Sequence, residues 1–325
     1  MIGVLLSAVL LGAPPFVGVA VTPYSEDPSR GLTFGGMIDE IHRLGATHVS
    51  IVVQWSQNNV ASHHIRPHPK ETQDEQVIRA MIRRARGLGL RVMLFPIIWV
   101  DERGPGLWRG TLRPENPVVW WASYRTFILH FAAVAQEEHA DLFSVGSELG
   151  SMEADAARWR RLIAEVRARF GGRLLYSANW DHYEHVPFWD ALDAIGLTGY
   201  HRLTQVQPPS QPTEAELLDS WSRIRTVLVD WQTNHHPDRP LLFTEIGYPS
   251  IDGAAYRPWE YTMGGRVDLE EQRRCWAAFS DTWRNDSHLG GFFAWNWWGV
   301  GGREDTNYTP RGKPSEQILR DFSRP

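Results

Sequence analysis

Eight short apolar runs alternate with segments of helical spacing along the 325-residue chain. Each run is rich in β-branched and aromatic residues and is bounded by turn residues, which is typical of a buried strand. The runs span residues 15–21, 47–55, 90–98, 141–148, 173–179, 194–200, 240–247 and 290–298. Because they are apolar almost throughout, they indicate parallel strands that are covered on both faces.

The segments between the runs carry apolar residues at a helical period. They predict helices at residues 34–46, 74–89, 120–139, 154–172, 214–235 and 268–286, and only the connection at 180–193 is too short for a full helix. Repeated strand-helix units favour an α/β fold, a single (β/α)8 TIM barrel, over an open doubly wound sheet, and no GxGxxG follows any run. We expect this one domain to occupy residues 15–325.

The first 14 residues form an apolar segment that is too short to span a membrane. One interpretation is a truncated secretory signal, although the usual positive start is missing. The other is an ordinary apolar segment that packs on the domain. We favour the signal, from which export to the periplasm or the medium follows; the second interpretation leaves a cytoplasmic location open.

The composition restricts the partners. The formal net charge is −5, and no long basic or acidic block occurs, so neither nucleic acid nor a membrane surface is an expected partner. The single cysteine, Cys275, excludes a disulfide framework and lies at helix-core spacing. The 16 tryptophans exceed what a core requires, and such rings stack on sugars or anchor protein interfaces. We expect a monomer.

The active site of a (β/α)8 barrel lies at the carboxyl ends of its strands. The candidate residues at the ends of the runs are Tyr24, Gln54, Trp55, Ser147, Glu148, Asn179, Trp180, Tyr200, Glu245, Trp295 and Trp297. Two of them are isolated glutamates.

Glu148 closes the fourth run and Glu245 the seventh, so in an eight-stranded barrel the two carboxylates would converge. A buried carboxylate is costly unless it is paired or hydrogen-bonded. Hydrolysis of a glycosidic bond needs such a pair, about 5–5.5 Å apart when the anomeric configuration is retained. The structural alternative is that each glutamate pairs with an arginine or caps a helix.

Five motifs make the chain resemble the glycoside hydrolases of clan A, the 4/7 superfamily. They are LFSVGSELGSME (142–153), LLYSANWDHY (174–183), LLFTEIGYPS (241–250), FFAWNWWG (292–299) and YTPRGKP (308–314). Within the clan the chain is most similar to family 113, whose characterised members are β-mannanases.

The resemblance implies a double displacement with Glu148 as acid/base and Glu245 as nucleophile. It further implies that Tyr200 hydrogen-bonds or orients the nucleophile and that Trp295 floors the subsite of the scissile sugar. This chemistry requires no metal or cofactor. Most clan members have asparagine before the acid/base, where this chain has Ser147. That difference leaves the sugar specificity open.

The sequence therefore predicts a retaining glycoside hydrolase that acts on β-linked hexose polymers or oligosaccharides, β-1,4-mannan first. Three alternatives remain: a β-glucan-active or exo-acting glycosidase of the same clan, a sugar-binding barrel without catalysis, and a protein-interaction scaffold.

Among the remaining residues, we expect Glu153 in the opening turn of a helix. Trp120 and Trp121 belong either to the sugar cleft, beside Arg109, or to a helix core.

Overall fold

The computed structural model describes residues 14–23, 26–30, 32–262 and 264–323. Within them the chain forms a closed barrel of parallel strands in sequence order. The strands are β1 (Phe16–Val21), β2 (His48–Gln57), β3 (Arg91–Val100), β4 (Leu142–Ser147), β5 (Arg173–Ala178), β6 (Ala194–Thr198), β7 (Leu241–Ile246) and β8 (Leu289–Ala294). The predicted (β/α)8 fold is confirmed. Residues 1–13 of the apolar segment predicted at 1–14, and the candidate Tyr24, lie outside the described residues.

All six predicted helices are present, and a further one follows β8. They are α1 (Phe34–Leu44), α2 (Glu75–Gly87), α3 (Pro117–Glu137), α4 (Ala156–Arg167), α5 (Glu214–His235), α6 (Leu269–Trp283) and α7 (Pro314–Phe322). Short 3-10 turns are η2 (Pro28–Arg30), η3 (Arg109–Thr111), η4 (Gly150–Met152), η5 (Tyr183–His185) and η6 (Trp189–Ala191). As predicted, the short connection between β5 and β6 holds no full helix.

Side-chain caps explain where the helices begin. Thr33, Asp74, Asn116, Asp155, Thr213 and Asp268 each accept a hydrogen bond from a backbone N–H in the first turn of the helix that follows. Such caps satisfy donors that the helix itself leaves without partners. No helix of the described residues is long and apolar enough to cross a membrane.

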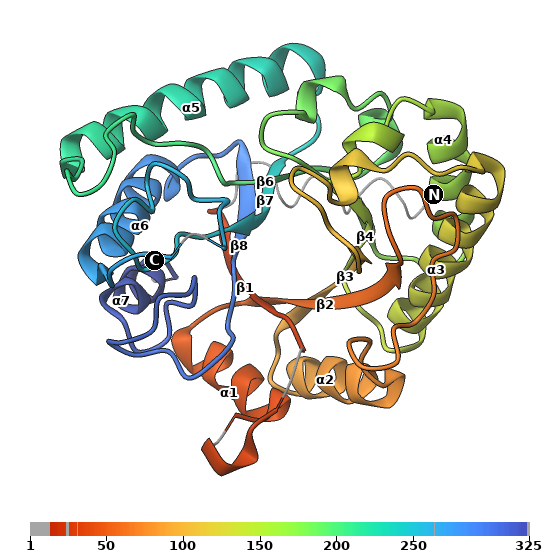
Figure 1. Ribbon diagram of the computed structural model, residues 1–325, viewed down its shortest axis with the longest axis horizontal. Coiled ribbons are helices and arrows are strands. Elements are labelled where there is room, and N and C mark those ends of the chain that lie inside the picture. The colour runs from red at the N-terminus through yellow and green to blue at the C-terminus, as the bar shows by residue number, and fades with distance from the viewer. Residues whose placement is uncertain (1–13, 24–25, 31, 263, 324–325) are drawn as a thin grey trace. The chain divides into compact units, whose positions relative to one another are not determined.

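The described chain divides into two compact units. One contains β1, β7 and β8 with α1, α5, α6 and α7, and in it β8 pairs in parallel with both β1 and β7. Helix α6 packs between α5 and α7 (Figure 1). The core of this unit is aromatic and contains edge contacts between the rings of Trp221, Phe243, Phe279 and Trp283.

The other unit contains β3, β4 and β5 with α2, α3 and α4, and consecutive strands pair in parallel. Trp120 and Trp121 lie buried in α3 against Tyr124, which decides between the two interpretations in favour of the helix core. Among the residues that the structure describes, eight tryptophans are buried: 120, 121, 159, 189, 221, 276, 283 and 297. Cys275 lies buried in α6, as expected.

Candidate active site

Glu148 follows β4 in an unusual backbone conformation. Its φ of 51° lies in the left-handed region, which side chains other than glycine seldom adopt. Two hydrogen bonds to β5 hold the turn: Glu148 N–H donates to Ser177 O over 2.7 Å, and Leu149 N–H donates to the Tyr176 hydroxyl over 2.8 Å. The Glu148 side chain ends in a buried position, with the residue only 6% exposed.

Arg109 is the charged partner of Glu148. The guanidinium lies on η3, in the connection after β3, and its Nη2 donates to Glu148 Oε2 over 2.5 Å. An arginine partner was the structural alternative in the sequence analysis, and the structure confirms that contact. The ion pair offsets the cost of burying the carboxylate, and it also fixes the orientation of Glu148 at the strand end.

Ser147, the last residue of β4, is buried, and its hydroxyl has no hydrogen-bond partner among the residues that the structure describes. A buried hydroxyl without a partner is costly in a folded protein. Ser147 immediately precedes Glu148 in the chain.

Glu153 corrects one expectation. It does not lie in the opening turn of a helix, because Asp155 caps α4 and the helix begins at Ala156. The Glu153 carboxylate is buried instead, and it bonds Tyr176 and His182. Burial raises the pKa of Glu153, while the contacts with Tyr176 and His182 oppose that rise.

Glu245 lies in β7, where it is buried. The Tyr200 hydroxyl donates to Glu245 Oε2 over 3.0 Å, and the backbone oxygen of Glu245 accepts from Gly199 N–H over 2.6 Å. The hydrogen bond that the resemblance implied between Tyr200 and Glu245 is therefore present. The catalytic roles of Glu148 and Glu245, and the convergence of their carboxylates, stay predictions.

The two candidate tryptophans after β8 have different surroundings. Trp295 is half-buried, and its backbone N–H donates to Ile246 O over 2.7 Å. Trp297 is buried, and its indole N–H donates to Glu40 of α1 over 2.8 Å. Glu40 also accepts a hydrogen bond from Arg311, so the indole of Trp297 is held by a carboxylate that is itself ion-paired. The sequence pattern did not predict this contact.

The remaining candidates lie at the ends of β2 and β5. Gln54 is half-buried and donates to Glu71 O, and it lines a narrow hollow with Thr22 and Pro23. The Trp55 ring packs instead against α3, where it contacts Phe127, His130 and Phe131. This packing gives Trp55 a structural role that Gln54 lacks, because neighbouring side chains of a strand point to opposite faces. Asn179 and Trp180 are half-buried after β5.

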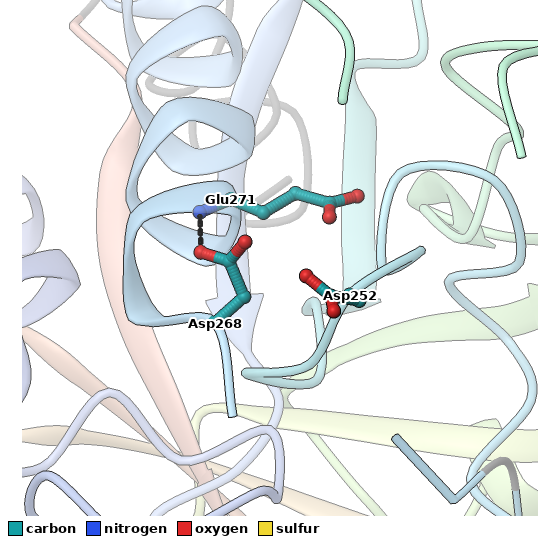
Figure 2. A group of neighbouring side chains, drawn as sticks. All are labelled: Asp252, Asp268 and Glu271. Atoms are coloured by element: carbon teal, nitrogen blue, oxygen red, sulfur yellow. Dashed lines mark hydrogen bonds between the residues drawn. The ribbon is translucent and has the colours of Figure 1, made fainter. Parts of the chain in front are cut away.

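Three acidic residues of the loop after β7 and of α6 lie close together, as Figure 2 shows: Asp252, Asp268 and Glu271. Their ligand atoms lie within 4.8 Å of one another, but each carboxylate already bonds protein groups. Asp252 pairs with Arg266, Asp268 caps α6, and Glu271 accepts from the backbone N–H groups of Gly253 and Ala255. This cluster therefore anchors the loop, and we assign no metal to it.

A closed parallel barrel with buried glutamates in β7 and directly after β4 fits the class of (β/α)8 glycoside hydrolases. The sequence profile of Glycoside Hydrolase Family 113 matches residues 35–310. The chain belongs to this family and is a glycoside hydrolase. A comparison with curated protein sequences gives no significant match.

Solved structures of the same family are similar over almost the whole chain. The β-mannanase AaManA from Alicyclobacillus acidocaldarius, in complex with ManMIm, is 28% identical with a TM-score of 0.81, covering 95% of this chain and 97% of that chain. A β-1,4-mannanase of family 113 is 24% identical with a TM-score of 0.79, at 95% and 98% coverage. A β-glucuronidase from Ruminococcus gnavus shares the fold alone, at 12% identity, a TM-score of 0.64, and 96% and 50% coverage.

Proposed function

We propose that the chain is a retaining β-mannanase that hydrolyses β-1,4-mannan with Glu148 as acid/base and Glu245 as nucleophile. The observation that carries the proposal is that a family 113 chain has a buried glutamate at the end of β4 and another in β7, each held by a hydrogen-bonding neighbour. The similar family 113 structures, described as β-mannanases, support mannan as the substrate.

In the first step, the Glu245 carboxylate attacks the anomeric carbon while Glu148 gives its proton to the leaving glycosidic oxygen. The carbon–oxygen bond to the leaving sugar breaks, and an ester between the sugar and Glu245 forms. In the second step, Glu148 takes a proton from water, and the water oxygen displaces Glu245 from the anomeric carbon. Two inversions give net retention.

Tyr200 supports the nucleophile in this scheme. Its hydroxyl donates to one carboxylate oxygen, Glu245 Oε2, and so fixes the rotation of the carboxylate. The half-buried Trp295, whose backbone N–H binds β7, offers an aromatic face to the sugar at the same strand ends. Export of the protein remains a prediction from the N-terminal segment.

The first experiment measures reducing-sugar release from β-mannan, glucomannan, β-glucan and xylan. We expect activity on β-mannan and a loss of about 10²–10⁴-fold or more in Glu148→Gln and Glu245→Gln. Glu138→Gln is the matched control, because Glu138 is also buried and paired with Arg79 and Arg83 but lies at the end of α3. A folded Glu245→Gln variant with wild-type activity would exclude the proposed nucleophile.

Two further readouts separate the alternatives. Product lengths from mannohexaose distinguish internal cleavage from exo action. Higher activity on β-glucan than on β-mannan would identify β-glucan as the substrate. The anomer formed first, observed by NMR, tests retention: an inverted product would overturn the double displacement. Sugar binding without hydrolysis would identify a sugar-binding barrel that lacks catalysis.

A further inference from the structure

One of the two hydrogen bonds from β5 that hold the turn of Glu148 is made by a side-chain hydroxyl group. Because Glu148 has a left-handed backbone, its conformation persists only if its surroundings impose it. The next backbone N–H, that of Leu149, donates to the Tyr176 hydroxyl over 2.8 Å. Tyr176 lies in β5 and is fully buried, so its hydroxyl has no contact with bulk water.

The direction of this hydrogen bond is fixed by Glu153. A tyrosine hydroxyl has one proton, and here it accepts from Leu149 and donates to Glu153 Oε1 over 2.6 Å. Without an acceptor at Glu153, the Tyr176 proton would have no partner in this chain of contacts. The buried carboxylate therefore determines how Tyr176 presents its oxygen to Leu149.

The other oxygen of the Glu153 carboxylate binds His182. Oε2 lies 2.6 Å from His182 Nδ1, and the His182 side chain is 39% exposed and stacks on His185. Glu153 is only 1% exposed, and it lies in the segment between η4 and α4. The helix cap is supplied by Asp155, so Glu153 is not needed to begin α4. Its two strong contacts instead join His182 to the turn after β4.

We propose that Tyr176, Glu153 and His182 form a positioning group that holds the turn of Glu148 in place for proton transfer to the leaving oxygen. This inference rests on the proposed function, because it assigns the acid/base role to Glu148. Tyr176 binds the turn through the backbone N–H of Leu149, and Glu153 and His182 act through Tyr176. Burial raises the pKa of Glu153, and the hydrogen bonds with Tyr176 and His182 oppose that rise only in part.

A positioning role differs measurably from a purely structural one. When the leaving group is a stable anion, such as 2,4-dinitrophenolate, departure needs no proton from the enzyme. When it is phenolate, which is much more basic, protonation by the acid is required. A variant that misplaces Glu148 therefore loses kcat/KM on the phenyl substrate and keeps much of it on the dinitrophenyl substrate. A variant that is merely less stable loses the same factor on both.

The experiment compares phenyl and 2,4-dinitrophenyl β-mannobiosides with the wild type, Tyr176→Phe, Glu153→Gln and Glu148→Ala. For Tyr176→Phe we expect kcat/KM on the phenyl substrate to fall about 10²-fold, because a displacement of about 1 Å costs that much. On the dinitrophenyl substrate we expect a loss below about 5-fold. Glu153→Gln keeps an acceptor for Tyr176, so it should fold and show a smaller loss of the same kind.

Tyr124→Phe is the matched control. Tyr124 is also fully buried, and its hydroxyl donates to Val145 O in β4 over 2.6 Å, but it does not bind the turn. Any loss of kcat/KM in Tyr124→Phe should be the same on the phenyl and the dinitrophenyl substrates.

Equal losses on both substrates in Tyr176→Phe and Glu153→Gln, with a leaving-group dependence in Glu148→Ala, would overturn the positioning inference alone. No leaving-group dependence in Glu148→Ala would overturn the proposed acid/base, and the inference with it.

Discussion

Arg109 and Glu148, which are 39 residues apart in the chain, form an ion pair with 2.5 Å between Nη2 and Oε2. Arg109→Ala leaves a buried carboxylate without its charged partner and lets its side chain rotate. We expect kcat/KM on mannan to fall about 10-fold and the free energy of unfolding to fall by about 2 kcal/mol. The expected loss in the free energy of unfolding is smaller than the cost of breaking a fully buried ion pair, because the Arg109 side chain is 20% exposed.

Arg109→Lys should fall between Arg109→Ala and the wild type, because lysine keeps the charge without the planar fork of the guanidinium. Kinetic assays and urea unfolding of both variants provide the measurement. Combining Arg109→Ala with Glu148→Ala should cost less stability than the sum of the two single changes. Additive changes would show that the pair has no energetic coupling.

Ser147→Ala removes a buried hydroxyl that has no partner among the described residues. We expect the free energy of unfolding to stay level or to rise by about 1 kcal/mol, because an unsatisfied polar group is lost. If the hydroxyl binds the sugar, kcat/KM on mannan falls between about 2- and 10-fold, the value of one net hydrogen bond. Parallel kinetics and urea unfolding check both expectations.

Ser144→Ala provides the contrast, since Ser144 Oγ donates to Gly146 O over 2.7 Å within the same strand. That change should cost stability and spare kcat/KM. If Ser147→Ala leaves kcat/KM unchanged, the hydroxyl has no role in substrate binding.

The strands were predictable because a parallel strand covered on both faces is a local apolar run, and each of the eight predicted runs overlaps a strand. The family resemblance implied the hydrogen bond between Tyr200 and Glu245, but most other contacts of the candidate site were not predictable. Glu153 precedes a helical pattern and so resembles a first-turn acid, but Tyr176 and His182, which bind it, come from β5 and the segment after it. Such contacts depend on how loops pack, and no local spacing encodes them.

Lys313→Met tests the loop that follows β8. The Lys313 ammonium is buried and donates to Ser250 Oγ over 2.7 Å and to Asp305 Oδ1 and Asn307 O over 2.8 Å. Burial lowers its pKa, and the contact with Asp305 opposes that change. Methionine keeps most of the length of the side chain but leaves Asp305 without its charged partner, so we expect a loss of about 3 kcal/mol in the free energy of unfolding.

Urea unfolding measures this loss, and limited proteolysis should cut the 299–313 segment faster in the variant. Arg303→Met, on the exposed part of the same loop, should change stability by less than about 0.5 kcal/mol. Equal stability of Lys313→Met and the wild type would refute an anchoring role.

His201, which follows Tyr200, gives the protein a predictable dependence of stability on pH. Burial lowers the pKa of His201 from 6.5 to about 3, because its neutral ring is favoured among apolar neighbours such as Trp221. The unfolded chain therefore binds a proton between pH 6.5 and about 3 that the folded chain does not. The contribution of His201 to stability is complete above pH 6.5 and decreases as the pH falls through that window, by about 1.4 kcal/mol per pH unit.

His201→Phe removes this titration while keeping an aromatic ring beside Trp221. Carboxylates also titrate at low pH, but they do so in both proteins, so the difference in the free energy of unfolding isolates His201. Relative to the variant, the wild type should lose about 2 kcal/mol between pH 7 and pH 5, as measured by urea unfolding at each pH. A difference that stays constant over this range would mean that His201 keeps its ordinary titration in the folded protein.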